Sequence, residues 1–361
     1  MGSDRQPSRR SPVHLGDYSM HPKIKLIAIA KDEAAYLPEW IFHHLYFGFD
    51  EIEVFVNRTC DNTLQLLSAI AEESPRVKFQ VIDWIDLTAP NISAHIQHIA
   101  YAYGYNQSKL ENTHIMFLDI DEFWTPLNFK DTIKDCVSRF EDASTIYFEW
   151  CTEAGTAEPF TFLQRAHAYK LSRLGKSLIR TNSKVQRIDI HKPLLGLDES
   201  TLLADGSTYR GSESEGLNHQ FVAKDKSSIK DYIIVHRMSR SEMEYLSMIY
   251  NGIPEEQGSF KLNRATGYEK ITEGFTTLAF DALAWTAYEL ARTKFFHAKR
   301  LRQIIPESQR FITDRYEKAI NALPDALKAH GEALEKVIQG LSSPVVADII
   351  TAYYNHSQPK D

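Results

Sequence analysis

Short apolar runs alternate with amphipathic helical segments through the first 150 residues, and this alternation most constrains the fold. The runs lie at 24–30, 51–57, 77–84, 115–118 and 144–150, and each has the length of a strand. The segments between them repeat apolar residues at helical spacing. Parallel strands need such long crossover connections, whereas antiparallel hairpins need only a few residues. We therefore predict an α/β fold with a doubly wound, mostly parallel sheet that is flanked by helices.

The rest of the chain divides into a leader, a looser middle and a helical end. Residues 1–22 are polar and basic and lack the apolar core of a signal peptide, so a disordered leader is expected. Residues 155–230 are expected to form loops and short strands. One long helix is predicted over 280–305, followed by three shorter ones. We therefore expect an α/β domain at 23–254 and a mainly helical region at 255–361.

Composition excludes several classes of protein. The net charge of −7 argues against nucleic-acid binding, which usually leaves a basic footprint. No segment approaches the roughly 18 consecutive apolar residues of a membrane span, so any membrane contact would be peripheral. The three cysteines are widely spaced and fit a reducing compartment, and a cytoplasmic location is expected. The oligomeric state is not predicted.

Acid and amide side chains gather directly after the predicted strands. Ligands of open α/β sheets sit beyond the carboxyl ends of the strands, near the point where strand order reverses. A fold needs only turn-forming residues there, so the density of carboxylates indicates a site. The segments concerned are 31–33, 57–61, 83–86, 119–122 and 149–153.

The most acidic of these strand ends is FLDIDEFW, which contains Asp119, Asp121 and Glu122. Extended backbone would put both aspartates on one side, where their repulsion opposes ionisation unless a cation compensates. Mg²⁺ and Mn²⁺ accept oxygen ligands and keep positions open for phosphate oxygens. One interpretation is therefore a divalent ion that bridges the protein to a diphosphate. The other is a strand-end turn whose acids cap the next helix.

Three segments, in order along the chain, resemble the motifs of GT-A glycosyltransferases of the family 2 and family 92 type. They are AKDEAAYLPEW, FLDIDEF and VHRMSRSEMEYL, and the resemblance covers about residues 24–252. It implies a GT-A-like fold with a helical C-terminal extension, a nucleotide-sugar donor, expected to be a UDP-sugar, and Mn²⁺ or Mg²⁺. It also implies transfer, with inversion, to a hydroxyl of a glycan or lipid-linked acceptor, as in polysaccharide biosynthesis.

The same resemblance implies roles for residues at the first two strand ends. Asp32 and Glu33 would line the base and ribose end of the donor pocket. Asn57 and Asp61 match positions that contact the nucleotide. These four residues would therefore bind the donor rather than take part in the chemistry.

The metal and the diphosphate would be held further along the chain. The resemblance implies that Asp119 and Asp121 bind both, with Asp121 the direct ligand and Glu122 behind it. His236 matches a late histidine that completes the metal coordination. The residues near enough for diphosphate contacts are Arg237, Arg240 and Ser241.

Inversion needs a carboxylate that takes the acceptor proton on the far side of the sugar. Glu153, directly after the fifth predicted strand, leads the candidates, and with Asp121 it forms the predicted catalytic pair. The remaining candidates for the base are Glu149, Asp198, Glu213 and Glu215.

Several basic groups have both a functional and a structural interpretation. Lys176 and its basic neighbours in 176–192 could bind phosphate or an anionic acceptor, or form a solvated strand face. His95 and His98 have the spacing of a metal pair on a helix. No third ligand supports that pair, so we expect them on the surface or in a pocket wall.

Two alternatives from other classes stay open. A haloacid-dehalogenase-like phosphatase also ends an apolar strand in Asp-x-Asp, and Asp119 would be its nucleophile. That motif continues to Thr or Val, where this chain has Glu122 and Phe123, and normally lies near the N-terminus. The second alternative is a catalytically inactive protein that only binds sugar nucleotides.

Overall fold

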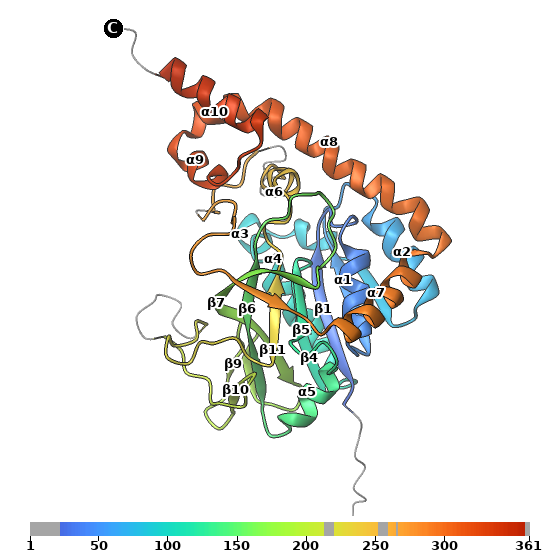
Figure 1. Cartoon of the computed structure of the whole chain (residues 1–361). Helices are drawn as coiled ribbons and strands as arrows, with labels where there is room; N and C mark the ends of the chain where they lie inside the picture. The colour runs from blue at the N-terminus through green and yellow to red at the C-terminus, as the bar shows by residue number, and fades with distance from the viewer. Residues whose placement is uncertain (1–21, 213–219, 252–258, 265, 358–361) are drawn as a thin grey trace, which may run out of the picture.

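A ten-stranded sheet runs through the centre of the structure, a computed structural model that describes residues 22–212, 220–251, 259–264 and 266–357 (Figure 1). Its strands are β1 (Ile24–Ala30), β2 (Glu51–Val56), β3 (Val77–Val81), β4 (His114–Phe117), β5 (Glu122–Pro126), β6 (Thr145–Glu153), β7 (Ala166–Arg180), β10 (Thr201–Leu203), β11 (Tyr232–His236) and β12 (Thr276–Ala279). The order is β3-β2-β1-β4-β7-β6-β11-β5, with β10 beside β6 and β12 beside β7. A separate pair consists of β8 (Val185–Arg187) and β9 (Leu194–Leu195). The leader predicted at 1–22 lies outside the described residues, except for Pro22.

The pairing of the strands confirms the predicted fold class. β1 pairs in parallel with β2 and β4, β2 with β3, and β6 with β10 and β11. The antiparallel strands are β7, between β4 and β6, and β5, beside β11. β4 is buried throughout, which explains why its sequence is a continuous apolar run rather than an alternating one.

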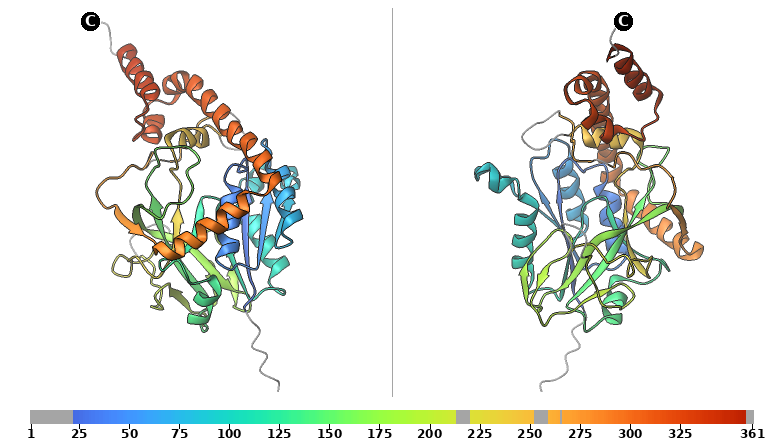
Figure 2. Two further views of the ribbon diagram at one scale, coloured as in Figure 1. Left: turned by 45° about the vertical axis from the view of Figure 1, so that its right-hand side comes forward. Right: turned by 90° about the vertical axis from the view of Figure 1, so that its left-hand side faces the viewer.

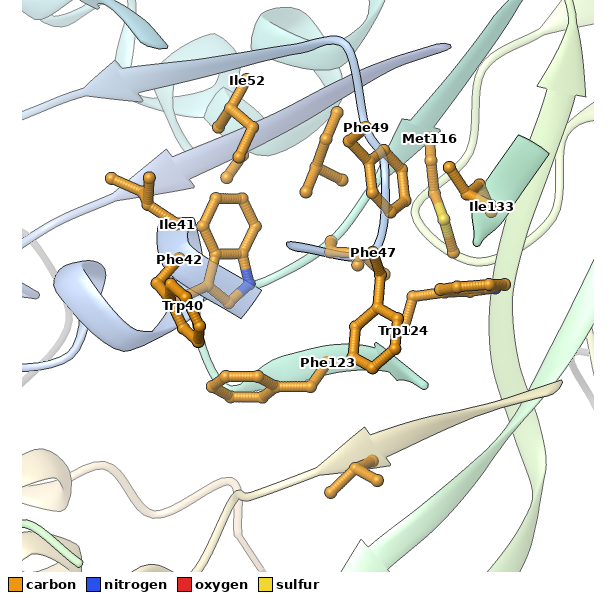
Figure 3. Packing of buried hydrophobic residues seen from close by; sticks show 14 of the residues in the cluster. Trp40, Ile41, Phe42, Phe47, Phe49, Ile52, Met116, Phe123, Trp124 and Ile133 are labelled. Carbon is orange, nitrogen blue, oxygen red and sulfur yellow. The ribbon is translucent and has the colours of Figure 1, made fainter. Parts of the chain in front are cut away.

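Helices cover both faces of the sheet. They are α1 (Leu37–Tyr46), α2 (Thr63–Glu73), η1 (Asp83–Leu87, a 3₁₀ helix), α3 (Pro90–Ser93), α4 (Ile96–Ser108), α5 (Ile133–Arg139), α6 (Glu242–Ile249), α7 (Ala282–Phe296), α8 (Lys299–His330), α9 (Glu332–Ile338) and α10 (Pro344–Ser357). Successive residues of β1 show the two layers, because Leu26 packs in the core with α1 and Ile27 in the core with α4. Trp40, Phe47 and Trp124 gather in the first layer (Figure 3). None of the helices in the described part combines the length and apolar character needed to cross a bilayer.

β7 is the largest departure from the prediction for the middle of the chain. Residues 155–230 were expected to form loops and short strands, yet they contain the longest strand, in the middle of the sheet. Its sequence hides this role because basic residues and Gly175 interrupt the apolar positions. A Cβ on Gly175 would lie 1.9 Å from the carbonyl oxygen of Phe148, so only glycine allows this close approach of β7 to β6.

Replacing Gly175 by alanine is expected to lower the free energy of unfolding by about 1–3 kcal/mol, because backbone must move to admit the methyl group. Urea unfolding of the purified chain measures this. Gly196→Ala is the control, since its Cβ would lie 3.3 Å from the Lys184 Cβ and 3.6 Å from the Lys184 carbonyl oxygen, a much milder contact. Equal losses in the two variants would contradict the prediction.

The C-terminal region joins the sheet instead of standing apart from it. The single helix predicted over 280–305 is wrong: α7 ends at Phe296 and α8 begins at Lys299. The break lets Trp285 from α7 and Leu301 from α8 pack in the same core as α1. A second core lies between α6, the later part of α8, α9 and α10 (Figure 2). The domain boundary predicted between 254 and 255 stays a prediction. Beyond it in the sequence, β12 pairs with β7, and α7 packs in the same core as the sheet.

Candidate active site

A cleft of about 760 Å³ lies at the carboxyl ends of β1, β4 and β11. It gathers side chains from segments more than 200 residues apart in the sequence. Its polar and charged lining residues are Glu33, Gln97, Asp119, Asp121, His191, His236, Ser239, Arg240, Glu244, Tyr245, Lys261, Asn263, Arg264 and Thr266. The position of this cleft agrees with the rule that ligands bind beyond the carboxyl ends of parallel strands.

The two aspartates of FLDIDEFW face different partners. The chain turns between β4 and β5, and the Glu122 N–H donates to the Asp119 carbonyl at 3.0 Å, so the extended backbone assumed for this segment is wrong. Asp119 points toward α4 and β7, where it accepts hydrogen bonds from Gln97 at 2.7 Å and Tyr101 at 3.2 Å. Asp121 faces the end of β11. The turn therefore separates the two carboxylates that alternation would have placed together.

Lys176 and Glu122 form a fully buried ion pair beneath this turn. The Lys176 Nζ lies 3.3 Å from Glu122 Oε2 and 3.0 Å from Asp119 Oδ2. Burial raises the pKa of Glu122, and the Lys176 ammonium opposes this shift. The solvated strand face proposed for Lys176 is therefore wrong, and its place in the site was missed. The signal was a lysine directly before the apolar Leu178 and Ile179 of a strand.

Asp121 meets His236 at the end of β11. The distance from Asp121 Oδ2 to His236 Nε2 is 3.5 Å, and the Trp150 ring packs against the imidazole at 4.3 Å between centroids. Burial alone would raise the pKa of Asp121, but His236 outweighs it and the net shift is downward. Burial alone would likewise lower the pKa of His236, and Asp121 reverses this. Both groups are thus held ready as charged or coordinating partners.

The donor set at this point suits a divalent ion that shares its ligands with a substrate. Within the described ranges, no group of three or more His, Cys, Asp or Glu side chains is placed to hold a metal by itself. Asp121 and His236 together offer one carboxylate and one imidazole. Mg²⁺ and Mn²⁺ commonly bind through one or two protein ligands and complete their shell with phosphate oxygens and water. The residues present therefore fit such an ion, and Asp119, with both oxygens engaged, stands outside this pair.

Of the residues predicted at the first strand end, Glu33 lines the cleft. Its Oε2 atom is buried and has no hydrogen-bond partner in the described residues, and burial raises its pKa to about 7. Arg240 lies 3.8 Å away and stacks on the Tyr36 ring at 3.4 Å from the centroid. Asp32, by contrast, accepts from the Cys60 N–H at 2.6 Å and pairs with Arg315 of α8 at 3.3 Å. Asp32 therefore fixes the loops instead of facing the cleft.

The second strand end also ties loops together. Asn57 donates to Asp83 at 3.2 Å, and Asp61 accepts from the Ala34 N–H at 3.0 Å. Three non-glycine residues that follow β1, β2 and β11 have positive φ. This conformation costs backbone energy and is common beside functional sites. They are Asp32 (56°), Arg58 (52°) and Arg240 (48°).

Arg237 and Glu153 lie in a buried ion network and not in the cleft. The Arg237 guanidinium donates to Glu153 at 2.7 Å, to Glu39 at 2.9 Å and to the Thr161 carbonyl at 2.6 Å. Arg237 is 5% exposed and Glu153 is 1% exposed. With its donors engaged, Arg237 is not placed for the diphosphate contact predicted for it. Glu153 is likewise not placed to reach an acceptor hydroxyl.

The other candidates for the base lie outside the cleft or outside the described residues. Glu149 is buried against Lys230. Asp198 is exposed and pairs with Lys184 at 3.6 Å. The two that fall outside the described residues are Glu213 and Glu215. Glu244, missed by the sequence analysis, lines the cleft but uses its Oε2 atom to cap α6 through Ser241.

Two buried histidines, His43 and His44, join α1 to β5. His43 Nε2 donates to the Trp124 carbonyl at 2.9 Å, and the Tyr288 hydroxyl donates to Nδ1 at 3.1 Å. His44 Nδ1 donates to the Trp40 carbonyl at 2.8 Å, and its Nε2 accepts from the Trp124 N–H at 3.2 Å. Burial lowers the pKa of His43 to about 3 and that of His44 well below its usual value. Both are therefore neutral.

The contribution of His43 and His44 to the free energy of unfolding is expected to fall as the pH drops below about 6.5, the ordinary histidine pKa. His43 and His44 have lower pKa values in the folded protein, so below 6.5 the unfolded chain binds more protons. Each contributes fully above 6.5 and loses about 1.4 kcal/mol per pH unit below it. Urea unfolding at pH 7.5 and 5.5 measures this slope. Compared with wild type, His43→Asn should raise the stability at pH 5.5 relative to that at pH 7.5, and the exposed His95→Gln should not; the same pH dependence in His43→Asn and wild type would contradict the prediction.

The sheet and the strand-end cleft form a GT-A-like fold, and the sequence comparison supports a glycosyltransferase. The sequence model of glycosyltransferase family 92 matches residues 26–202. The resemblance stated from the motifs is confirmed over this segment, which is just under half of the chain, and a transferase is favoured over a haloacid-dehalogenase-like phosphatase. None of the curated proteins compared with the chain matches it.

Solved structures with similar folds share little sequence with the chain. A mannosyltransferase from Pyrobaculum calidifontis, solved with GDP-Man and Mn²⁺, is 10% identical, with 94% of this chain and 82% of that chain covered and a TM-score of 0.33. Glucosyl-3-phosphoglycerate synthase from Mycobacterium tuberculosis, solved with Mn²⁺, UDP and phosphoglyceric acid, is 15% identical over 36% of this chain and 43% of that chain, at a TM-score of 0.23. A mycobacterial protein is 14% identical over 36% and 41%, at 0.27. The chain thus spans less than half of the latter two proteins.

Proposed function

We propose that the protein is a metal-dependent glycosyltransferase that moves a sugar from a nucleotide-diphosphate donor to a hydroxyl of a glycan or lipid-linked acceptor. The observation that carries the proposal is the pairing of Asp121 with His236 at 3.5 Å, at one end of a cleft that Arg240 also lines. The family match supports sugar transfer as the reaction. The donor is expected to be a UDP-sugar and the reaction to proceed with inversion, in the cytoplasm, with at most peripheral membrane contact.

Asp121 and His236 would hold Mn²⁺ or Mg²⁺, which supplies positive charge for the departing diphosphate when it is bound. Arg240 is the cation best placed to bind a phosphate oxygen beside them, because Tyr36 supports its guanidinium from behind. Charge that is fixed before the reaction stabilises a leaving group without reorganising at the moment of bond cleavage. The cleft would therefore favour the separated diphosphate over the intact donor.

Glu33 is a better placed general base than Glu153. It lines the cleft, its carboxylate is only weakly paired, with Arg240 at 3.8 Å, and burial raises its pKa to about 7. A base with a pKa near the working pH is the most effective one. In this role Glu33 would take the acceptor proton, and the nucleotide contact implied by the resemblance would fall to neighbouring groups.

The purified full chain, incubated with UDP-sugars and GDP-sugars with and without Mn²⁺, tests the proposal by mass spectrometry of the sugar and the nucleotide. We expect donor cleavage that depends on Mn²⁺ and on one nucleotide. Tight nucleotide binding without cleavage, with a range of added acceptors, would favour the inactive sugar-nucleotide-binding alternative. Hydrolysis of simple phosphoesters that is lost in Asp119→Asn would overturn the proposal in favour of the phosphatase.

A further inference from the structure

We propose that Lys176 is a positioning residue that withholds Asp119 from the divalent ion, so that the cleft holds this ion firmly only together with a nucleoside diphosphate. The inference rests on the proposed function and assigns a regulatory role to a residue that sugar transfer itself does not require. Its basis is the arrangement of one buried ammonium among the carboxylates of the turn between β4 and β5.

Lys176 occupies a position that costs free energy unless its charge is used. Its side chain is fully buried in the middle of β7, where an isolated ammonium would be strongly disfavoured. Two carboxylates compensate it: Glu122, also fully buried, and Asp119, whose side chain is 37% exposed toward the cleft. A lysine required only for pairing with Glu122 would not need to reach Asp119 as well.

The backbone fixes where the ammonium lies. Gly175 brings β7 against the Phe148 carbonyl of β6, so the residue that follows has little freedom to move. The His191 Nδ1 donates to the Gly175 carbonyl at 3.0 Å on the same stretch. Lys176 thus projects from a point where β7 and β6 approach each other closely, and it reaches Asp119 just beyond the end of β4.

The contacts of Asp119 explain why the site has only two protein ligands ready for a metal. Lys176 holds one of its oxygens, and Gln97 and Tyr101 hold the other. Asp121 and His236 remain as the pair at the end of β11, and Asp119 lines the same cleft without joining them. Without Lys176, Asp119 and Glu122 would be uncompensated carboxylates close to Asp121, and a divalent ion would be the natural replacement for the lost charge.

The consequence is a coupling between metal and nucleotide. In the wild-type protein a diphosphate must supply the oxygens that Asp119 does not, so each ligand raises the affinity of the cleft for the other by the same factor. In a variant without the ammonium, Asp119 would supply an oxygen instead. The metal would then bind without the nucleotide, and the coupling would shrink.

Isothermal titration of MnCl₂ into the full chain, alone and with saturating UDP or GDP, tests this inference. In Lys176→Met we expect Mn²⁺ to bind at least about tenfold more tightly than in wild type when no nucleotide is present, because one repelling unit charge is gone. The factor by which nucleotide raises the Mn²⁺ affinity should fall correspondingly. The matched control is Lys230→Met, which removes another buried lysine, paired with Glu149 outside the cleft, and should leave Mn²⁺ affinity unchanged.

Should Lys176→Met not fold, Lys176→Met with Glu122→Gln removes both buried charges and keeps Asp119 released, so the same tightening is expected. Unchanged or weaker Mn²⁺ binding in a folded variant overturns the inference. Equal tightening in Lys230→Met would do so as well. Failure of the proposed function is distinguishable, since wild type would then bind no Mn²⁺ even with UDP or GDP present.

Discussion

Replacing Asp121 by asparagine is expected to lower the rate of sugar transfer at least about 10³-fold, the effect typical of losing a group that stabilises charge on a leaving group. The carboxylate faces His236 at 3.5 Å, and asparagine keeps the shape while removing the charge that binds the metal. Mn²⁺ binding in the presence of nucleoside diphosphate should weaken in parallel. Rate measurements at saturating donor and calorimetry on the same preparations give the two readouts.

The fold should tolerate Asp121→Asn, because this side chain stabilises the site and not the core. Asp198→Asn is the matched control: it removes an exposed carboxylate that pairs only with Lys184 and should leave transfer unchanged. Thermal unfolding separates loss of function from loss of structure. Retention of more than about a tenth of the wild-type rate would show that Asp121 is not a metal ligand.

Replacing Arg237 by methionine is expected to lower the free energy of unfolding by about 3–5 kcal/mol. The guanidinium neutralises Glu39 of α1 and Glu153 of β6, and both carboxylates are almost completely buried. Without Arg237, these two carboxylates stay buried, and no other cation of the described residues lies within hydrogen-bonding distance of them. Removing one member of a buried ion network costs far more than the network as a whole contributes, because the remaining charges stay desolvated.

Urea unfolding of Arg237→Met measures this loss, and Arg139→Met is the control. Arg139 pairs with Asp231 at the surface, where exposed ion pairs contribute little, so its replacement should leave stability nearly unchanged. A second check is the triple variant in which Glu39 and Glu153 also become glutamine, which should recover part of the loss. A small effect of Arg237→Met alone would return Arg237 to the candidates for diphosphate binding.

The parts of the fold that local pattern determines could be predicted from the sequence. β1 to β4 and the helices between them follow from apolar runs and helical spacing, and the acids of FLDIDEFW, singled out because acids rarely crowd a strand end, include two that line the cleft, Asp119 and Asp121. β7 could not be predicted, since Gly175 and Lys176 make sense only against Phe148 and Asp119. Tertiary contacts determine which residues such positions require, and the contacting residues lie tens of positions away in the sequence.

The same dependence on tertiary contacts explains where the predicted site differs from the structure. The resemblance put Arg237 near the expected ligand and its place after a predicted strand did the same for Glu153, yet the two side chains pair with each other in the interior. Alternation put Asp119 beside Asp121, but the turn that leads into β5 directs them to different partners. Charge type and order along the chain were therefore informative, whereas the direction of a side chain depended on strands that local pattern did not reveal.

The place of β11 determines how this protein can be cut or recombined. The family match ends at residue 202, but β11 lies between β6 and β5 and carries His236. A fragment that stopped at 202 would leave both neighbours with unpaired edges, which invite aggregation. It would also lose Arg315, the α8 side chain that holds Asp32. Expression of the matched segment alone should therefore yield insoluble material, and any exchange of this module between proteins has to carry the late strand and the long helix with it.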